Sequence, residues 1–381
     1  MLQRLYVDNY KSLVNFDLQF GALNLLLGDN GSGKTTVFEV LNKLHLLLVA
    51  AKLVYRVFPS TSLTKWLKSS TQQFELSIKS GLGSYRYILQ VEHDKTNRQA
   101  FIQHESLYLD QQVLVEFASG SVKLYSDDAA IIAEYPADSS RSIVATIPPR
   151  RNTTKLTAFQ EQMATLIIVH PITIDWIMSS ESAEEGHQPS LNLENFVSWY
   201  RYLIQDGNFY YHLVNDLKKV IRNFRSLSLT VVGEDRRLLI VDFQDEKSGT
   251  TASFRFDELS DGQRMLIVLY TLLHLPDHAD SRSHRFMVCI DEPENFIGLR
   301  EIQPWLASML ERVQDNDLQL ILISHHPESI NYLLMPDETH VGLWFSREHT
   351  LAPTRVEPVR IPAEELPVSE LIARGWLENA R

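Results

Sequence analysis

Alternating apolar and polar positions open the chain. The alternation has a period of two residues. It covers Leu2–Val7 and again Leu13–Phe20, and it predicts two β-strands. Leu23–Leu27, apolar apart from one asparagine, is typical of a buried strand, and a glycine-rich turn and an apolar-rich helix from about Lys34 to Lys52 follow it. Further alternation with Gly and Asp turns predicts antiparallel strands at Phe74–Ile78, Tyr85–Val91, Ala100–Leu109 and Gln112–Phe117.

The middle of the chain changes to helical spacing. From about Leu191 to Phe224, apolar residues recur every three or four positions. Five of them would share one helix face: Leu193, Phe196, Val197, Tyr200 and Leu203. Two alternating segments, Leu227–Val232 and Arg237–Phe243, then predict a β-hairpin.

The last third predicts an α/β core. A helix is expected after Ser260, and two apolar strands follow at Phe286–Ile290 and Leu318–Ile323. A helix-like stretch, Glu301–Val313, lies between these strands, with Pro304 in its first turn. The order strand, helix, strand implies a parallel crossover connection.

Length and composition describe an ordinary soluble globular protein of one or two domains. The chain has 381 residues, of which 44% are hydrophobic and 22% charged. Leu44–Val54, the nearest candidate for a membrane span, is too short and contains His45 and Lys52. The N-terminus lacks the layout of a secretory signal, so we expect a cytoplasmic protein without membrane contact. The single cysteine, Cys289, lies in an apolar run and is expected to be buried.

The net charge of −12 argues against a protein whose only task is to coat nucleic acid. Two small basic clusters leave DNA as a candidate partner: Arg150, Arg151 and Lys155, then Lys218, Lys219, Arg222 and Arg225. Clusters of this size are more often solvated surfaces than binding sites.

Residues 28–35 carry a phosphate-binding motif. They fit the spacing G-x-x-x-x-G-K-T between an apolar strand and a helix. Glycines allow successive backbone N–H groups to point at phosphate oxygens, and the helix N-terminus adds partial positive charge. Lys34 can reach the β- and γ-phosphates, and the Thr35 hydroxyl can bind Mg²⁺. The expected nucleotide site comprises Asn30, Gly31, Ser32, Gly33, Lys34, Thr35 and Thr36.

Two acids follow the apolar strand Phe286–Ile290. Carboxylates at the end of a buried strand are costly unless they have a function or a partner. Asp291 is placed to hold Mg²⁺ beside Thr35, and Glu292 is placed to polarise an attacking water as general base. The alternative is a pair of structural acids that cap the loop at Pro293.

The hexapeptide Leu259-Ser260-Asp261-Gly262-Gln263-Arg264 precedes an apolar-striped helix. Ser260 and Gln263 have the spacing of a capping box, which any helix can use. A helix N-terminus with a serine hydroxyl and a nearby glycine is also an anion site. Both interpretations stay open on this pattern alone.

The hexapeptide resembles the signature loop of ABC-type ATPases, with Asp261 where many members have glycine. In that family, the loop of one subunit binds the γ-phosphate that the P-loop of the other subunit holds. The resemblance therefore implies Mg-ATP as the ligand, contacts from Ser260, Gly262 and Gln263, and an ATP-dependent head-to-tail homodimer. It also implies hydrolysis of ATP to ADP and phosphate.

The segment Ile323-Ser324-His325-His326-Pro327 resembles the switch-histidine segment of the same family. The resemblance gives His325 the role of sensing or positioning the γ-phosphate, whereas the alternative is a loop histidine that caps the next helix. Asn295–Leu299 falls where the family's D-loop lies but departs from its common pattern. Gln90 and Gln103 are candidates for the Q-loop glutamine, although ordinary strand residues are expected there.

The spacing of the motifs resembles that of RecF-like and structural-maintenance-of-chromosomes heads more than that of transporter ATPases. More than half of the chain separates Gly28 from Leu259, whereas transporter ATPases have a compact insertion there. Asn9-Tyr10-Lys11-Ser12 resembles the start of RecF-like and structural-maintenance-of-chromosomes heads, in which the basic residue, here Lys11, lies near the phosphates. A surface lysine in a strand turn is the alternative. The insertion has no sustained heptads that would form a coiled-coil arm, and no fused TOPRIM nuclease is expected.

The resemblance implies an α/β P-loop NTPase fold of ABC-head type, with a mixed-sheet core, an antiparallel β subdomain and a helical insertion. We expect an ATP-binding lobe over residues 1–175, the helical insertion over 176–226, and a lobe with the signature, acidic and switch-histidine motifs over 227–381.

Many stand-alone proteins that resemble RecF and OLD ATPases are encoded beside a nuclease or other effector in bacterial phage defence. We therefore expect ATP to close a dimer that controls a partner such as a TOPRIM-type nuclease. Two other functions stay open. One is an ATP-dependent DNA-binding protein of recombination and repair, and the less favoured one is the ATPase subunit of a transporter.

Overall fold

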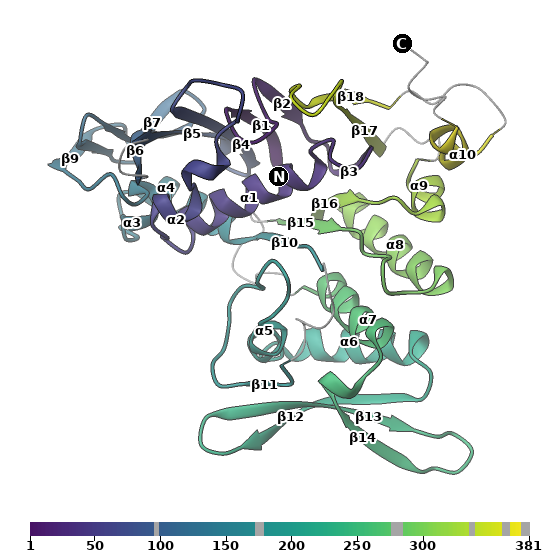
Figure 1. Cartoon of the computed structure of the whole chain (residues 1–381). Helices are drawn as coiled ribbons and strands as arrows, with labels where there is room; N and C mark the ends of the chain where they lie inside the picture. Colours follow the sequence, from purple (N-terminus) through teal and green to yellow (C-terminus); the bar gives the residue numbers. More distant parts are fainter. Residues whose placement is uncertain (95–98, 172–178, 276–284, 335–339, 360–365, 375–381) are drawn as a thin grey trace.

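Three β-sheets and a column of helices build the molecule (Figure 1). The computed structural model describes residues 1–94, 99–171, 179–275, 285–334, 340–359 and 366–374. Its helices are α1 (Lys34–Leu48), α2 (Val54–Val57), α3 (Ile143–Thr146), α4 (Thr154–Ala164), α5 (Phe196–Leu203), α6 (Gly207–Val220), α7 (Asp261–Leu273), α8 (Leu299–Gln314), α9 (Pro327–Leu333) and α10 (Val368–Ala373). No helix in this described part is both long and apolar enough to cross a bilayer.

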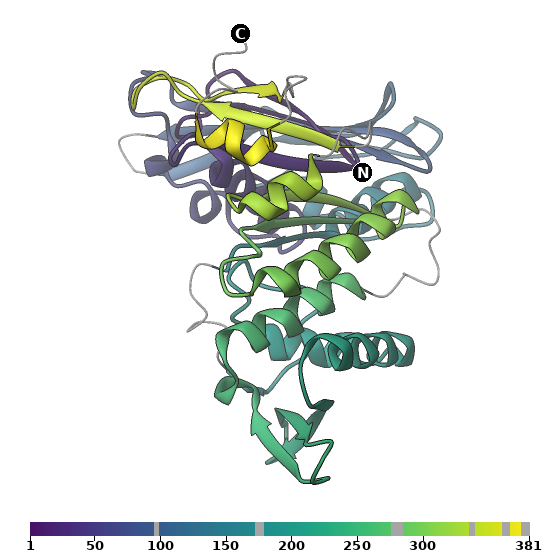
Figure 2. The same cartoon turned by 90° about the vertical axis from the view of Figure 1, so that its right-hand side faces the viewer.

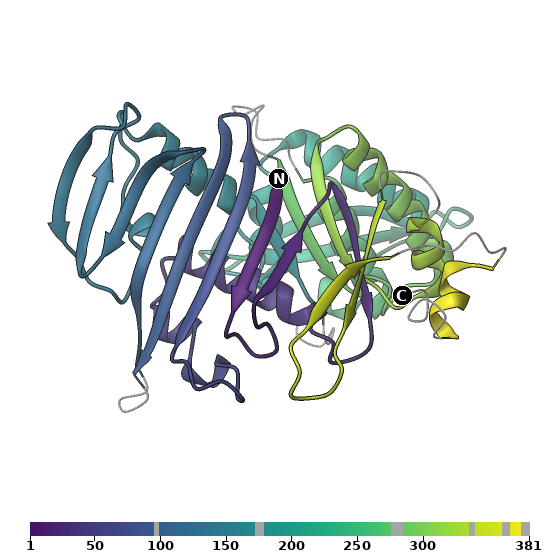
Figure 3. The ribbon, with the colours of Figure 1, turned by 90° about the horizontal axis from the view of Figure 1, so that it is seen from above.

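An antiparallel sheet forms most of the first half of the chain and is seen from above in Figure 3. Its order is β2-β1-β4-β5-β6-β7-β8-β9. The strands are β1 (Leu2–Asp8), β2 (Phe16–Gln19), β4 (Thr71–Ser80), β5 (Gly83–Asp94), β6 (Gln99–Leu109), β7 (Gln112–Ala118), β8 (Ser121–Tyr125) and β9 (Ile131–Pro136). Buried residues alternate along β4 and β5, as expected for a sheet with one face on a core, and α1 lies beside that face in Figure 1.

A six-stranded sheet forms the centre of the molecule, in the order β10-β15-β16-β3-β17-β18. The strands are β10 (Leu166–Val169), β15 (Phe286–Asp291), β16 (Leu318–Ile323), β3 (Leu23–Gly28), β17 (His340–Ser346) and β18 (Arg355–Pro358). All are parallel except β18, which pairs antiparallel with β17. The parallel crossover from β15 to β16 is therefore confirmed.

Both faces of this sheet are buried. Leu26 and Met287 pack into one core with α1 and the antiparallel sheet, whereas Leu25 and Val288 pack into a second core with residues of α5–α9. In Figure 2 these helices form a column below the central sheet. A parallel sheet covered on both faces reads as continuous apolar runs, which is why the sequence shows no alternation in these strands.

A small sheet below the helices comprises β11 (Glu181–Ser182), β12 (Phe224–Val232), β13 (Arg236–Gln244) and β14 (Thr251–Arg255). The predicted hairpin corresponds to β12 and β13. Residues 225–255 therefore extend away from the central sheet, as Figure 1 shows at the bottom of the molecule.

The structure differs from the helical expectations, or refines them, in four details. The helical pattern over Leu191–Phe224 is two helices, because the Asp206 side chain accepts hydrogen bonds from two backbone N–H groups and starts α6. Leu193 precedes α5 in a left-handed conformation and is not on its face. The first helix ends at Leu48 rather than Lys52, and α8 begins before the predicted start, so Pro304 is its sixth residue.

The division into lobes over 1–175, 176–226 and 227–381 stays a prediction. Its first boundary lies outside the described residues. The first and third segments contribute strands to one central sheet, since β3 pairs with β16 and β17.

Gly28 is held where no side chain fits. Its φ is 130°, and a Cβ atom there would lie 2.1 Å from the carbonyl oxygen of Phe345 in β17. Gly31, in the same loop, has φ 79° with nothing within 4 Å of the Cβ position.

We expect Gly28→Ala to lower the free energy of unfolding by about 3 kcal/mol, because the strand must move as well as the loop. Gly31→Ala, the matched control, should lower it by about 1 kcal/mol. Urea unfolding without nucleotide measures both, and equal losses would contradict the packing argument.

Candidate nucleotide-binding site

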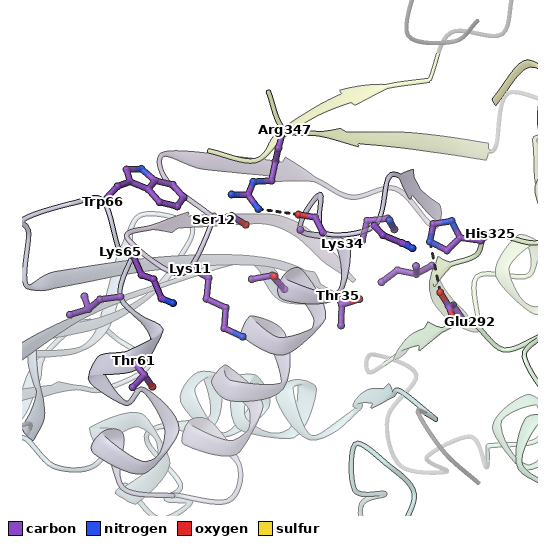
Figure 4. Close-up of a pocket in the computed structure, with 16 residues that line it drawn as sticks. Lys11, Ser12, Lys34, Thr35, Thr61, Lys65, Trp66, Glu292, His325 and Arg347 are labelled. Carbon is purple, nitrogen blue, oxygen red and sulfur yellow. Dashed lines mark hydrogen bonds and ion pairs between the residues drawn. The ribbon is translucent and has the colours of Figure 1, made fainter. Parts of the chain in front are cut away.

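A pocket of about 510 Å³ lies at the carboxyl end of β3, against residues that follow β15 and β16 (Figure 4). Its volume is in the range of small-molecule sites, and ligands of open α/β sheets bind at this edge. Its lining comprises Lys11, Ser12, Asn30, Gly31, Gly33, Lys34, Thr35, Thr36, Thr61, Leu63, Lys65, Trp66, Glu292, Ile323, His325 and Arg347. Six of the seven residues expected in the phosphate cradle therefore line one pocket.

The cradle loop bends through left-handed backbone at Gly28, Gly31 and Gly33. Lys34 Nζ donates hydrogen bonds to the carbonyl oxygens of Gly28, at 2.6 Å, and Asp29, at 2.9 Å. Burial lowers the pKa of Lys34, and the nearby carboxylates act in the opposite direction. This cation is thus held inside the loop, where the phosphates of a nucleotide would compete with the two carbonyl groups for it.

Ser32, the seventh cradle residue, is buried behind the pocket. Its carbonyl oxygen accepts a hydrogen bond of 2.8 Å from the hydroxyl of Thr354, whose Oγ1 also lies 2.9 Å from Ser12 Oγ. A Cβ at Gly33 would lie 2.6 Å from the same hydroxyl. The segment before β18 therefore fixes the shape of the loop.

Asp291 is buried, and two side chains meet at its carboxylate. Thr35 Oγ1 donates a hydrogen bond of 3.0 Å to Asp291 Oδ2, and His170 Nδ1 lies 2.6 Å from the same oxygen. A hydroxyl and a carboxylate are oxygen ligands of the kind that Mg²⁺ prefers. These groups fit Mg²⁺ beside the phosphate loop, and Thr35 and Asp291 are the residues that would hold it.

Glu292 adopts a left-handed backbone conformation, with φ of 51°. Such strain in a residue with a side chain is typical of functional sites. Its carboxylate accepts a hydrogen bond of 2.6 Å from Asn295 Nδ2 and lies 3.8 Å from His325 Nε2. Burial and the charge of Lys34 lower the pKa of His325. Glu292 and His325 are therefore adjacent at one end of the pocket.

Glu294 joins the acidic loop to the histidine segment. Its buried carboxylate accepts a hydrogen bond of 2.5 Å from Ser324 Oγ, which in turn accepts one of 3.1 Å from the backbone N–H of His326. His326 is the N-cap of α9, accepting from the Glu328 N–H at 3.2 Å. The capping alternative thus describes His326, which leaves the neighbouring His325 free to face the pocket.

Lys11 lines the pocket in a left-handed turn and forms an ion pair with Glu39 of α1. The position is consistent with both interpretations of this residue, the phosphate contact and the surface lysine. Its role at the phosphates stays a prediction.

The segment that resembles the signature loop lies outside the lining of this pocket. Ser260 caps α7, and Gln263 completes the capping box, as one of the two interpretations expects. Gly262 lies against the segment Asn295–Leu299, because a Cβ atom there would be 3.0 Å from the Phe296 carbonyl oxygen. Asp261 forms an ion pair with Arg264, which gives a structural reason for an acid where many ABC members have glycine.

The basic clusters are partly committed to other contacts. Lys155 Nζ donates to Gln112 Oε1 at 2.7 Å and to the Asp127 carbonyl oxygen at 2.6 Å. Lys219 forms an ion pair with Asp216 at 2.6 Å. The Asp216 carboxylate offsets the charge of Lys219, whereas the Lys155 ammonium is already bonded to two neutral acceptors.

Sequence reasoning missed His170. The sequence contains a signal for it, since the apolar run Leu166–Val169 is followed directly by a polar residue, as are the apolar runs of β15 and β16.

Gln90 and Gln103, the two Q-loop candidates, are in β5 and β6 and do not line the described pocket. The segment around Trp66, which carries no recognisable motif, supplies another wall of the pocket.

Comparisons with known proteins concern the family and the fold. Residues 23–331 match the family described as AAA domain, putative AbiEii toxin, Type IV TA system. The structure of SmcHead bound to the C-winged helix domain of ScpA is similar at 11% identity with a TM-score of 0.55, covering 95% of this chain and 98% of that chain. The SMC head domain from Thermotoga maritima gives 11% identity and a TM-score of 0.46 over 94% and 99% of the two chains. No curated protein matches. The predicted fold class is confirmed.

Glu294 generates a prediction about pH. Burial raises the pKa of this carboxyl, so the folded protein holds its proton more tightly than the unfolded chain does. Stability from this group is therefore complete below the ordinary carboxyl pKa and is lost as the pH rises through the folded value. Glu294→Gln keeps the hydrogen-bonding side chain and removes the proton. We therefore expect the free energy of unfolding of the variant, minus that of wild type, to be larger at about pH 8 than at about pH 5. The variant thus gains stability relative to wild type as the pH rises.

Urea unfolding at the two pH values measures this difference. Glu348→Gln, at an exposed position, is the matched control and should leave the pH dependence of wild type intact. A Glu294→Gln protein with an unchanged pH dependence would show that Glu294 is ionised at low cost.

Proposed function

The chain belongs to the family of AAA domains described as putative AbiEii toxin, Type IV TA system, and on this basis we propose that it binds and hydrolyses Mg-ATP as a dimeric switch that controls a partner protein. The observation that carries the proposal is the meeting of four motif residues at one sheet edge: Thr35, Asp291, Glu292 and His325. They come from three strands that end side by side.

Each residue has a chemical task in this proposal. The backbone N–H groups of the cradle and Lys34 bind the β- and γ-phosphates. Mg²⁺ held by Thr35 and Asp291 would neutralise charge on these phosphates. Glu292 takes the proton of the attacking water, and Asn295 holds its carboxylate in place. His325, whose pKa is lowered by burial and by the charge of Lys34, can donate one hydrogen bond from a ring N–H to an oxygen of the γ-phosphate.

The dimer is proposed because one copy supplies an incomplete site. Ser260 is exposed at the start of α7 and is absent from the described pocket lining of its own chain. A second copy placed head to tail would bring its Ser260, Gly262 and Gln263 to the γ-phosphate. ATP would then stabilise the closed dimer by its differential affinity for that state, and hydrolysis would release it.

The partner is proposed to be an effector such as a TOPRIM-type nuclease, in phage defence. The family description, which names a toxin–antitoxin system, supports a defence role over transport. The similar SmcHead structure contains a domain of another protein, which motivates a search for a protein partner. Binding of DNA, the alternative, is less favoured because Lys155 and Lys219 have partners within the chain.

Two substitutions separate binding from hydrolysis. Lys34→Ala removes the cation inside the cradle and should weaken ATP binding by more than about 100-fold. Glu292→Gln keeps the shape of the site without a base and should slow hydrolysis by about 100-fold or more while ATP remains bound. Light scattering after size exclusion should then show a Glu292→Gln dimer in saturating Mg-ATP and a monomer without nucleotide. A Glu292→Gln protein that binds Mg-ATP yet stays monomeric would contradict the dimer.

His170 supports the metal ligand Asp291, so its loss should act on the Mg²⁺ requirement. We expect His170→Ala to raise the Mg²⁺ concentration for half-maximal ATP hydrolysis by about tenfold, since residues that orient a metal ligand have effects of this size. Gln90→Ala, at one of the two discarded Q-loop candidates, is the control and should leave the requirement unchanged. An unaltered Mg²⁺ titration for His170→Ala would remove His170 from the site.

A further inference from the structure

The hairpin of β17 and β18 contacts the phosphate cradle from outside. β17 pairs with β3, the strand that leads into the cradle, and both lie at the top of the molecule in Figure 1. Two residues that connect the hairpin strands return to the cradle loop. One is Arg347, whose bond to the loop is the dashed line beside it in Figure 4, and the other is Thr354. Both lie outside the motifs that predict the site from the sequence.

Arg347 uses all three of its guanidinium nitrogens as donors. Nη1 donates to the Gly31 carbonyl oxygen at 3.1 Å, Nε donates to the Ala352 carbonyl oxygen at 3.0 Å, and Nη2 donates to the Thr350 carbonyl oxygen. The guanidinium carbon also lies 6.0 Å from the centroid of the Trp66 ring, which limits its movement on another side. All three acceptors are neutral, so these bonds leave the positive charge of the side chain in place beside the loop.

Thr354 contacts the next peptide unit of the loop. Its buried hydroxyl donates to the Ser32 carbonyl oxygen at 2.8 Å. A hydroxyl has one proton and a carbonyl oxygen can only accept, so the Ser12 hydroxyl supplies the proton of the bond that joins it to Thr354 Oγ1 at 2.9 Å. The Thr354 N–H donates to the Ser12 carbonyl oxygen at 2.9 Å. Ser12 therefore fixes Thr354, and the Thr354 hydroxyl proton is committed to the cradle.

The two contacts determine the direction of two backbone N–H groups. In a trans peptide unit the C=O and N–H groups point in opposite directions. Because the carbonyl groups of Gly31 and Ser32 face the hairpin, the N–H groups of Ser32 and Gly33 face the inside of the loop. The Ser32 N–H shows this direction, since it donates at 3.1 Å to the Asp29 carbonyl oxygen, which also accepts from Lys34 Nζ at 2.9 Å.

We propose that Arg347 and Thr354 are positioning residues that raise the affinity of the cradle for a phosphate chain by holding the Ser32 and Gly33 N–H groups toward it. The inference rests on the proposed nucleotide binding and extends it to the hairpin of β17 and β18. A loop that already has its bound conformation loses less entropy when the ligand binds. Hydrogen bonds in a chain polarise one another, so a cationic donor at the Gly31 carbonyl also makes the N–H of the same peptide unit a stronger donor.

A residue that acts through the cradle has a recognisable pattern of effects on ligands. Arg347 also lines the pocket, so it could instead touch the ligand itself. A direct contact with the base or ribose would affect ATP and ADP but not inorganic tripolyphosphate, which has neither. A direct contact with the γ-phosphate would affect ATP but spare ADP. Loss of the support behind the cradle should weaken all three ligands by a similar factor, because each places phosphate groups in the loop.

Equilibrium titration of the full chain with Mg²⁺ and ATP, ADP or tripolyphosphate tests the inference. Arg347→Ala should weaken all three by about tenfold, because a hydrogen bond from a charged donor is lost. Thr354→Val, which lacks the hydroxyl, should weaken them by about fivefold, whereas Thr354→Ser, which keeps it, should bind within about twofold of wild type. Arg355→Ala, at an exposed arginine of β18, is the matched control and should leave all three affinities unchanged.

The rate of hydrolysis supplies a second readout. Glu292 and His325 are untouched in these variants, so Arg347→Ala and Thr354→Val should raise the KM for Mg-ATP and keep kcat within about threefold of wild type. A general loss of folded structure would lower the amount of active protein and would not be restored by Thr354→Ser.

The outcomes separate this inference from the proposed function. Wild-type affinities in Arg347→Ala and Thr354→Val, a loss confined to ATP or to the two nucleotides, or equal losses for Thr354→Val and Thr354→Ser would overturn the positioning role alone. Lys34→Ala that still binds ATP would instead overturn nucleotide binding in the cradle. If Thr354→Val does not fold, Arg347→Ala decides with the same three ligands, since its side chain is only half-buried.

Discussion

A buried carboxylate at the end of a buried strand is the constraint on which this site depends. Asp291 is 2% exposed, and an unpaired charge there would be costly. Thr35 and His170 approach the same carboxylate oxygen, and Lys34 lies close enough for its pKa to respond to this charge. The same carboxylate is the group proposed to hold Mg²⁺, so the contacts that offset its buried charge also place it beside the phosphate loop.

The parallel sheet is what brings these groups together. Strands buried on both faces can place polar side chains only where they end, and the carboxyl ends of parallel neighbours share one edge. Residues after β3, β10, β15 and β16 consequently meet there. The C-terminal strands add contacts at the same edge. β17 pairs with β3, and the residues that follow it include Arg347 and Thr354, which donate hydrogen bonds to carbonyl oxygens of the cradle loop.

Local patterns in the sequence predict what depends on local physics. Alternation located most of the antiparallel strands, and the P-loop spacing located the cradle, because both are set by a few neighbouring residues. His170 depends on a four-residue strand that pairs with β15 more than a hundred residues later, so spacing along the chain cannot identify its partner. Trp66 lies in a segment without periodicity, held by the side chain of Asn9, and only tertiary structure reveals it. The break between α5 and α6 escaped because Asp206 ends one apolar stripe without interrupting its spacing.

The two interpretations of Ser260 need not exclude each other. In the capping box its hydroxyl accepts a hydrogen bond of 3.4 Å from the Gln263 N–H and donates to Gln263 Oε1 at 3.1 Å, contacts that fix the start of α7 while the residue remains exposed. A helix start that is already capped is rigid. This rigidity would lower the entropy lost when the γ-phosphate of ATP held by a second copy binds there. The ion pair between Asp261 and Arg264 adds to this rigidity but places a carboxylate near the proposed phosphate position. Because like charges repel, closure of the proposed dimer would require Asp261 to stay paired with Arg264. Asp261, which stands where many ABC-type ATPases have glycine, would therefore affect the affinity of the two copies for each other.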